Sequence, residues 1–427
     1  MRDDRDTWAS FRYHRTLRVL RALTPNIAWF FLGQLTSRIG DALRLVALPW
    51  LLIEMTHSAD TLAVMGIAAA VPFILFGFAG GVFADRHDRR RIMITADAAR
   101  ALILAMVPVF SVLGLLAPWH IYVATFLASV AAIFFYPAET ALVPMIAPAK
   151  DLVTLNATFS LLRQSVALVG SALAGVTVAA FGPAPALAVD AVSFAVSAAA
   201  IGAIRVDNDS HVGVDRAVSL LSDVRAGVGF IVRNGTARGL VVVTLVMNGA
   251  HLPLMGTFLP LFVNEALLSN AAGFGSLMAA DSAGLITGWL VLARLGGHKP
   301  PWILLGIGTL CMGIGLVAFS FACTLSVALG IAFAVGVAGS ATNPPATALL
   351  QTTIPSEMRG RVASALMISG YLLSSVAIAI GPALIARVGL RGYYLGNALV
   401  IAILGLAVLR ARGFVRPDVS GVPGRLI

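Results

Sequence analysis

The stretch from Thr61 to Arg91, TLAVMGIAAAVPFILFGFAGGVFADRHDRRR, decides the class of this fold. Its first part, Leu62 to Phe83, contains no charged residue and is long enough for an α-helix to cross the hydrocarbon core of a bilayer. The remainder gathers Asp85 and four arginines into a few residues. Short loops on the cytoplasmic side of a membrane are rich in such basic residues. We therefore expect a membrane-spanning helix followed by a cytoplasmic loop.

The composition of the whole chain indicates the same class. Of its 427 residues, 59% are hydrophobic and only 12% are charged, and the mean hydropathy is +0.90. A water-soluble domain carries about 25% charged residues, so half of that charge is missing here. Hydropathy predicts an all-α integral membrane protein with twelve spans. The spans are Asn26–Ile53, Leu62–Phe83, Ile92–Leu116, His120–Val143, Leu155–Phe181, Ala184–Ile204, Gly239–Val263, Ala271–Leu292, Trp302–Phe321, Leu325–Leu350, Val362–Ala386 and Gly392–Leu409.

The basic residues predict the orientation of the chain. Arginine and lysine together number 30, against 20 acidic residues. Of these 30, 24 fall in the two ends and in loops on one side of the predicted membrane. Because basic residues are retained on the cytoplasmic side, both termini are predicted to be cytoplasmic. The net charge of +10 then reflects this retention, and we expect no nucleic acid partner.

The longest connection divides the spans into two groups of six. We expect a cytoplasmic arm (residues 1–25), a first bundle (26–204), a cytoplasmic linker (205–238), a second bundle (239–409) and a cytoplasmic tail (410–427). Within the linker, apolar residues at helical spacing predict an amphipathic helix on the membrane surface: Val218, Leu221, Val224, Val228 and Ile231.

An internal repeat relates the two bundles. A shift of 207 residues places Pro137 on Pro344 and Asp41 on Asn248, and it brings all six spans of each group into register. Because six is even, the two bundles have the same orientation. This is the parallel repeat of one class of secondary transporter.

The loop after the second span has a specific order of residues. Gly81 is followed by Asp85-Arg86 and then by Arg89-Arg90. This order resembles the signature loop of the major facilitator superfamily. Together with Gly33-Gln34 and Arg359-Gly360-Arg361, it resembles the branch that contains macrolide effluxers and the enterobactin exporter. One departure is Asp88, where the general pattern has glycine.

The resemblance implies the major facilitator fold, with two pseudo-symmetric six-helix bundles in a bacterial cytoplasmic membrane. It also implies that the loop forms a conformational latch in which Gly81 permits close helix packing and charged residues form a switchable network. We expect Asp97 and Arg100 to brace this loop, and Glu139 has a similar interpretation. The predicted latch residues are Gly81, Asp85, Arg86, Arg89, Arg90, Asp97 and Arg100.

Ionisable residues inside a span are costly and are therefore candidates for function. The first span contains Arg38, Asp41 and Arg44, spaced so that they lie broadly on one helix face. Asp41 is a candidate proton carrier, and a structural ladder of ion pairs is the alternative. Asp190, near the outer end of the sixth span, is interpreted as structural.

Two further residues are candidate proton sites in the second bundle. Asp281 lies about ten residues into the eighth span, with no lysine or arginine nearby in sequence. Arg163 in the fifth span is a possible structural partner. His251 lies in the middle of the seventh span and titrates in the physiological range, although a satisfied core histidine is the alternative.

The cavity-lining helices of the resembled fold supply the substrate-cavity candidates. Their side chains include hydrogen-bonding groups, charges and one aromatic ring. The candidates are Gln34, Arg38, Asp41, Phe134, Arg163, Gln164, Asn248, His251 and Asn343.

The energy source is predicted to be an ion gradient. The chain has no Gly-Lys dipeptide for a phosphate-binding loop and no cysteine and histidine cluster with metal spacing, so we expect neither an enzyme nor a cofactor. The leading hypothesis is a monomeric, proton-coupled exporter of a small amphipathic molecule such as a drug or siderophore. Alternatives are a symporter or facilitator that takes up a metabolite, an exporter or flippase of a lipid-like molecule, and a membrane scaffold.

Overall fold

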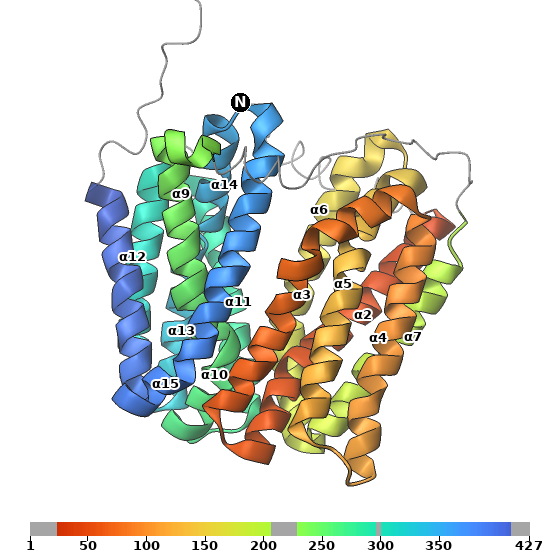
Figure 1. The fold of residues 1–427 in the computed structure, drawn as a ribbon, viewed down its shortest axis with the longest axis horizontal. Helices are drawn as coiled ribbons and strands as arrows, with labels where there is room; N and C mark the ends of the chain where they lie inside the picture. Colours follow the sequence, from red (N-terminus) through yellow and green to blue (C-terminus); the bar gives the residue numbers. More distant parts are fainter. Residues whose placement is uncertain (1–23, 206–228, 296–299, 411–427) are drawn as a thin grey trace, which may run out of the picture. The chain divides into compact units, whose positions relative to one another are not determined.

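A computed structural model describes residues 24–205, 229–295 and 300–410, and these residues fold into helices without any strand (Figure 1). They divide into two compact units, which fall within Met1–Thr56 with Ala68–Arg216 and within His57–Ile67 with Ala217–Ile427. Most of the amphipathic helix predicted for the linker, including Val218, Leu221, Val224 and Val228, lies outside the described residues.

Six long helices make up the first unit, apart from the first turns of α3, which cluster with the second unit. Buried apolar side chains such as Phe30, Met93, Phe135 and Leu142 form a continuous core in this unit. The helices are α2 (Pro25–Thr56), α3 (Ala59–Arg86), α4 (Arg89–Val112), α5 (Pro118–Ile146), α6 (Leu152–Phe181) and α7 (Pro183–Gly202).

The second unit has a more irregular first span. Its α9 continues into π-helical turns, and Gly389, with a φ of 75°, interrupts α15 and divides it into two helical parts. The elements are α9 (Gly235–Val246), η2 (Met247–His251), η3 (Pro253–Thr257), α10 (Leu259–Leu261), η4 (Phe262–Ala266), α11 (Ala271–Leu295), α12 (Pro301–Ser320), α13 (Leu325–Gly339), α14 (Asn343–Thr353) and α15 (Ser356–Arg410).

Ten helical segments of the described chain are long and apolar enough to cross a membrane. One of them, Ala365–Arg410, includes the interruption at Gly389 and covers the last two predicted spans. Helix α2 is not among the ten, because its charged and polar residues lower its hydropathy. The prediction of an all-helical membrane protein is confirmed, and the count of twelve spans stays a prediction.

Glycines allow the helices of the second unit to pack closely. A Cβ atom at Gly336 of α13 would overlap the carbonyl oxygen of Asp281 in α11, and one at Gly284 of α11 would overlap the carbonyl oxygen of Phe333 in α13. Small residues are the usual means by which membrane helices approach one another. The contact between α11 and α13 therefore fixes the backbone that carries Asp281.

Candidate functional site

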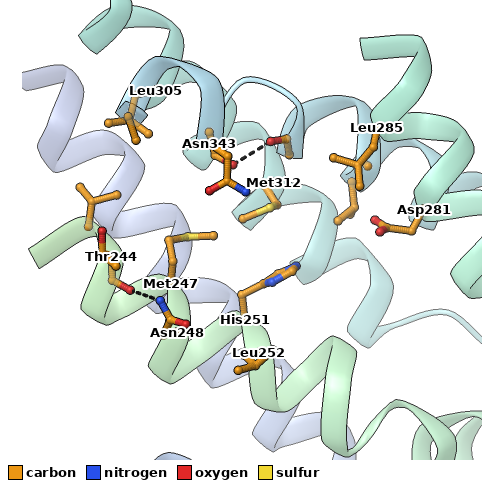
Figure 2. Close-up of a pocket in the computed structure, with 16 residues that line it drawn as sticks. Thr244, Met247, Asn248, His251, Leu252, Asp281, Leu285, Leu305, Met312 and Asn343 are labelled. Carbon is orange, nitrogen blue, oxygen red and sulfur yellow. Dashed lines mark hydrogen bonds between the residues drawn. The ribbon is translucent and has the colours of Figure 1, made fainter. Parts of the chain in front are cut away.

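The second unit contains a cavity of about 280 Å³. Residues from α9, η2, α11, α12, α13 and α14 line it, so it lies within the bundle (Figure 2). Its wall combines polar groups with flexible apolar side chains. Among the lining residues are Thr244, Met247, Asn248, His251, Asp281, Leu285, Leu305, Met312, Thr342 and Asn343.

This cavity brings together four residues that the sequence singled out. The sequence predicted that the substrate cavity is lined by Asn248, His251 and Asn343. It predicted that protons are carried by Asp281 and His251. Figure 2 shows the side chains of His251 and Asp281 directed toward the same space from different helices. Within the described part of the chain, neither side chain has a hydrogen bond or an ion pair.

Local helix geometry places Asn248 and His251 in the wall. Both belong to the π-helical turn η2, and a second π-helical turn begins at Pro253, whose ring leaves no N–H to donate. The amide of Phe258 donates to the carbonyl of Pro253 at 2.9 Å, as the wider π turn requires. The amide group of Asn248 donates to the carbonyl of Thr244 at 2.8 Å. Sequence periodicity did not predict these turns, although Pro253 was a local signal.

Asp281 also borders a second, smaller cavity of about 90 Å³. Among the residues that the structure describes, Asp281 and His251 are the only ionisable ones in the walls of these two cavities. The other residues around the smaller cavity are Met255, Leu259, Leu277, Met278, Ser282, Phe319 and Ala332.

In the first unit, the charges of α2 are engaged in ion pairs. Arg38 pairs with Glu139 of α5 at 2.7 Å. Arg44 pairs with Asp41 one turn away and, through Nε, with Asp190 of α7 at 3.3 Å. Glu139 was predicted to support the loop after α3, and the structure instead pairs it with α2. Asp190 is fully buried and is part of the ion-pair network that includes Asp41.

A third ion pair lies in an aromatic environment. Arg100 donates to Asp97 at 2.6 Å, and both side chains are almost fully buried. The guanidinium of Arg100 lies 4.3 Å from the ring centre of Phe135 and 4.4 Å from that of Phe194. Cation–π contacts of this kind stabilise a desolvated guanidinium. Arg100 therefore links α4 to α5 and α7.

The loop between α3 and α4 is held by helix caps. The side chain of Asp88 is the N-cap of α4 and accepts hydrogen bonds from the amides of Arg90 and Arg91. This explains the departure from glycine at this position. The side chain of Arg90 donates to the carbonyls of Ile201 and Gly202 at the end of α7. Asp85 is exposed, and its predicted role in a latch stays a prediction.

The glycine that permits close packing in this region is Gly80. A Cβ atom there would overlap the backbone of Ile133 in α5, whereas one at Gly81 would meet no described atom within 4 Å. The close packing predicted for Gly81 is therefore made by its neighbour, because only Gly80 faces α5.

The remaining cavity candidates belong to the first unit. Gln34 is buried, Gln164 and Phe134 are half-buried, and Arg163 is exposed. The ring of Phe134 packs edge-on against that of Phe83, with 5.3 Å between the ring centres.

The helices of this chain are arranged as in known membrane transporters. The fold matches that of solved transporters, including the nucleoside transporter NupG, with a TM-score of 0.71 at 12% identity over 91% of this chain and 98% of that one. A bacterial homologue of the human lysosomal transporter Spinster matches with a TM-score of 0.65 at 13% identity, over 91% and 95% of the two chains. These matches show the fold, and the family and relatives described next show that the protein is a membrane transporter and not an enzyme.

The chain belongs to the family of transmembrane secretion effectors, which it matches over residues 20–416. It is 25% identical to the multidrug efflux pump Tap of Mycobacterium tuberculosis, over 88% of this chain and 91% of that protein. It is 27% identical to macrolide efflux protein A of Streptococcus pyogenes, over 87% and 92%. The resemblance to the drug-exporter branch of the major facilitator superfamily is thereby confirmed.

Proposed function

We propose that the protein is a proton-coupled antiporter that exports a small amphipathic molecule, such as a drug or siderophore, by alternating access. The observation that carries this proposal is the cavity of the second unit, where His251 and Asp281 face the lumen without a partner in the described chain. The relatives named for drug efflux support export as the direction.

The free-energy cost of placing an ionisable side chain inside a membrane helix favours a functional role for Asp281. Insertion scales assign about 2.5–3.5 kcal/mol to an acidic or basic residue at the centre of a membrane helix. An ion pair offsets part of this cost, and Asp281 has none among the described residues. Proton exchange between this side chain and the cavity would account for the presence of an unpaired carboxyl group inside a span.

The cavity wall matches an amphipathic substrate. Asn248 and Asn343 offer hydrogen-bond donors and acceptors, while Met247 and Met312 offer flexible, polarisable surface that adapts to different apolar shapes. Binding sites for small molecules commonly combine a mostly apolar wall with a few polar groups. Both features suit a transporter of drug-like molecules.

We place the protein as a monomer in the cytoplasmic membrane of a bacterium, with both termini in the cytoplasm. The bacterial origin of the relatives and the distribution of basic residues support this orientation. Protons enter through Asp281 or Asp41 as the substrate leaves. The two units move relative to each other during this exchange, as is usual for transporters built from parallel repeats.

Inside-out membrane vesicles provide the test. With an acidic interior imposed, ethidium and erythromycin should accumulate in vesicles that contain the wild-type protein. Replacement of Asp281 by Asn should lower gradient-driven accumulation at least tenfold, because the cavity loses its carboxylate. Glu265→Gln is the matched control, since Glu265 is an exposed carboxylate of the same unit, at η4, and borders neither cavity.

Normal gradient-driven transport in Asp41→Asn, Asp281→Asn and the double variant would contradict the proposal. Accumulation in right-side-out vesicles driven by an acidic exterior would instead indicate symport into the cell.

A further inference from the structure

The clustered charges of the first unit do not balance. Three guanidinium groups and four carboxylates lie close together on α2, α4, α5 and α7, so one carboxylate is in excess. The groups are Arg38, Arg44, Arg100, Asp41, Asp97, Glu139 and Asp190.

Two of the guanidinium groups are each matched by one carboxylate. Arg38 pairs with Glu139 at 2.7 Å, and Arg100 pairs with Asp97 at 2.6 Å. Each of these two pairs has no net charge, so the excess carboxylate is not in either of them.

The unmatched carboxylate lies beside the third guanidinium group, that of Arg44. Arg44 contacts Asp41 through one terminal nitrogen and Asp190 through Nε, at 3.3 Å from Oδ2. The side chain of Asp190 is 0% exposed, whereas those of Asp41 and Arg44 are 29% and 26% exposed. In the described chain, neither carboxylate oxygen of Asp190 has a hydrogen-bond partner, so its contact with Nε of Arg44 is an ion pair without a hydrogen bond. One positive charge thus serves two carboxylates, of which the inner one is shielded from solvent.

The backbone of α2 is shaped to admit Asp190. A Cβ atom at Gly40 would lie 2.6 Å from Oδ1 of Asp190 and would overlap the hydroxyl of Ser193. Glycine at this position therefore lets the carboxylate approach α2 and reach Arg44.

No other charge among the described neighbours cancels the excess. The phenol of Tyr136 on α5 lies near Asp41 but carries no charge at neutral pH. The membrane-embedded part of α6 carries only Arg163, which is exposed and seven residues before Gly170, the residue that packs on Ala42. Seven residues of helix span about 10 Å, so Arg163 lies away from Asp190 along the axis.

We propose that Asp41 and Asp190 hold one proton between them and that Arg44 turns toward whichever carboxylate is ionised. Two carboxylates that share one site cannot both be ionised without a large penalty in a medium of low dielectric constant. Asp41 exchanges the proton with water. When Asp41 is protonated and neutral, Asp190 is ionised and pairs with the guanidinium of Arg44. Asp190 is therefore part of the proton-carrying machinery, which its position near the end of a span did not indicate.

The role of this pair in transport rests on the proposed proton coupling, but the shared proton is measurable without transport. The test is infrared spectroscopy of the full chain in lipid nanodiscs, in the Asp281→Asn background, which removes the carboxylate of the cavity, and the substitutions of Asp41 and Asp190 assign the remaining signal to this pair. Carbon-13 labelling of aspartate separates the carbonyl stretch of protonated aspartic acid from lipid ester bands. We expect the band of one protonated aspartic acid at neutral pH.

Either Asp41→Asn or Asp190→Asn should abolish that band, because each leaves one carboxylate for one guanidinium. Asp60→Asn is the control, since Asp60 is an exposed aspartate at the start of α3, and it should leave the band unchanged. Absence of the band at neutral pH before either substitution would overturn the inference, even if a variant fails to fold. So would persistence of the band in both variants.

The two proposals can fail separately. If the band is absent while gradient-driven export still requires Asp281, only the shared proton is wrong. If the band is present but transport is unaffected by loss of Asp41 and Asp281, the proposed function is wrong and the pair is a structural proton site.

Discussion

The two units differ in the surroundings of the ionisable residues inside their helices. In the first unit, Arg38, Arg44 and Arg100 each contact at least one carboxylate on the same or a neighbouring helix. In the second unit, His251 and Asp281 line a cavity, and neither has such a partner in the described residues. The same sequence signal, a charge in an apolar span, therefore has two structural meanings. The two cases are distinguished by whether the ionisable side chain has a partner of opposite charge within its unit.

Glycines permit close helix packing in both units, for example at Gly40 and Gly80 of the first, but among the described residues only the first unit adds ion pairs between helices. Ion pairs connect α2 to α5 and α7 in the first unit. In the second unit, glycines permit backbone contact between α11 and α13, and Gly313 of α12 and Gly405 of α15 allow similar contact between those two helices, which lie side by side (Figure 1). The contact between α11 and α13 is made by backbone atoms and does not use the carboxylate of Asp281. This carboxylate is therefore available for another role.

The largest effect is expected from breaking the most buried pair. Arg100→Met leaves the buried carboxyl group of Asp97 without its partner, which costs about 3–5 kcal/mol in the free energy of unfolding. Thermal unfolding in detergent should show a large drop in melting temperature. The double variant Asp97→Asn with Arg100→Met should recover most of it. A single variant as stable as the wild type would contradict a structural role for this pair.

The next largest effect concerns the glycine contact of the second unit. Gly336→Leu should destabilise the protein by about 3 kcal/mol, since its side chain must displace the backbone at Asp281. Gly330→Leu is the matched control on the same helix, because a Cβ atom there meets no described atom within 4 Å. Equal melting temperatures for the two variants would show that α11 and α13 are not locked together here.

Neutralising one carboxylate in each unit tests the comparison directly. Glu139→Gln leaves Arg38 without its partner and should lower stability by about 1–3 kcal/mol. Asp281→Asn breaks no ion pair and should leave the melting temperature unchanged or raise it. Thermal unfolding of both variants in the same detergent measures the difference. If Asp281→Asn were the more destabilising change, Asp281 would have a structural role.

The smallest effect is expected at the loop after α3. Asp88→Ala removes the N-cap of α4 and should cost about 1 kcal/mol, whereas Asp88→Asn should retain most of the stability because an amide oxygen also accepts the two hydrogen bonds. Chemical denaturation of the two variants checks this. A loss of export without a loss of stability would instead support a direct role of the loop in the latch.

Hydropathy and a short loop motif were enough to predict the all-helical membrane class, the family resemblance and the approximate positions of the helices. These depend on the length and hydropathy of continuous segments and on a short loop motif, which are local properties of the chain. The sequence also identified Asn248, His251, Asp281 and Asn343, because polar residues are conspicuous in apolar helices.

Helix packing in three dimensions determines which of these residues face a cavity and which are paired. Asp190 contacts Arg44, and Glu139 contacts Arg38, across helices whose sequence positions are about 100 or more residues apart. Likewise, Gly80 and not Gly81 faces a neighbouring helix. Such contacts depend on the rotation and separation of packed helices, and a rotation of one residue changes the neighbour without altering hydropathy.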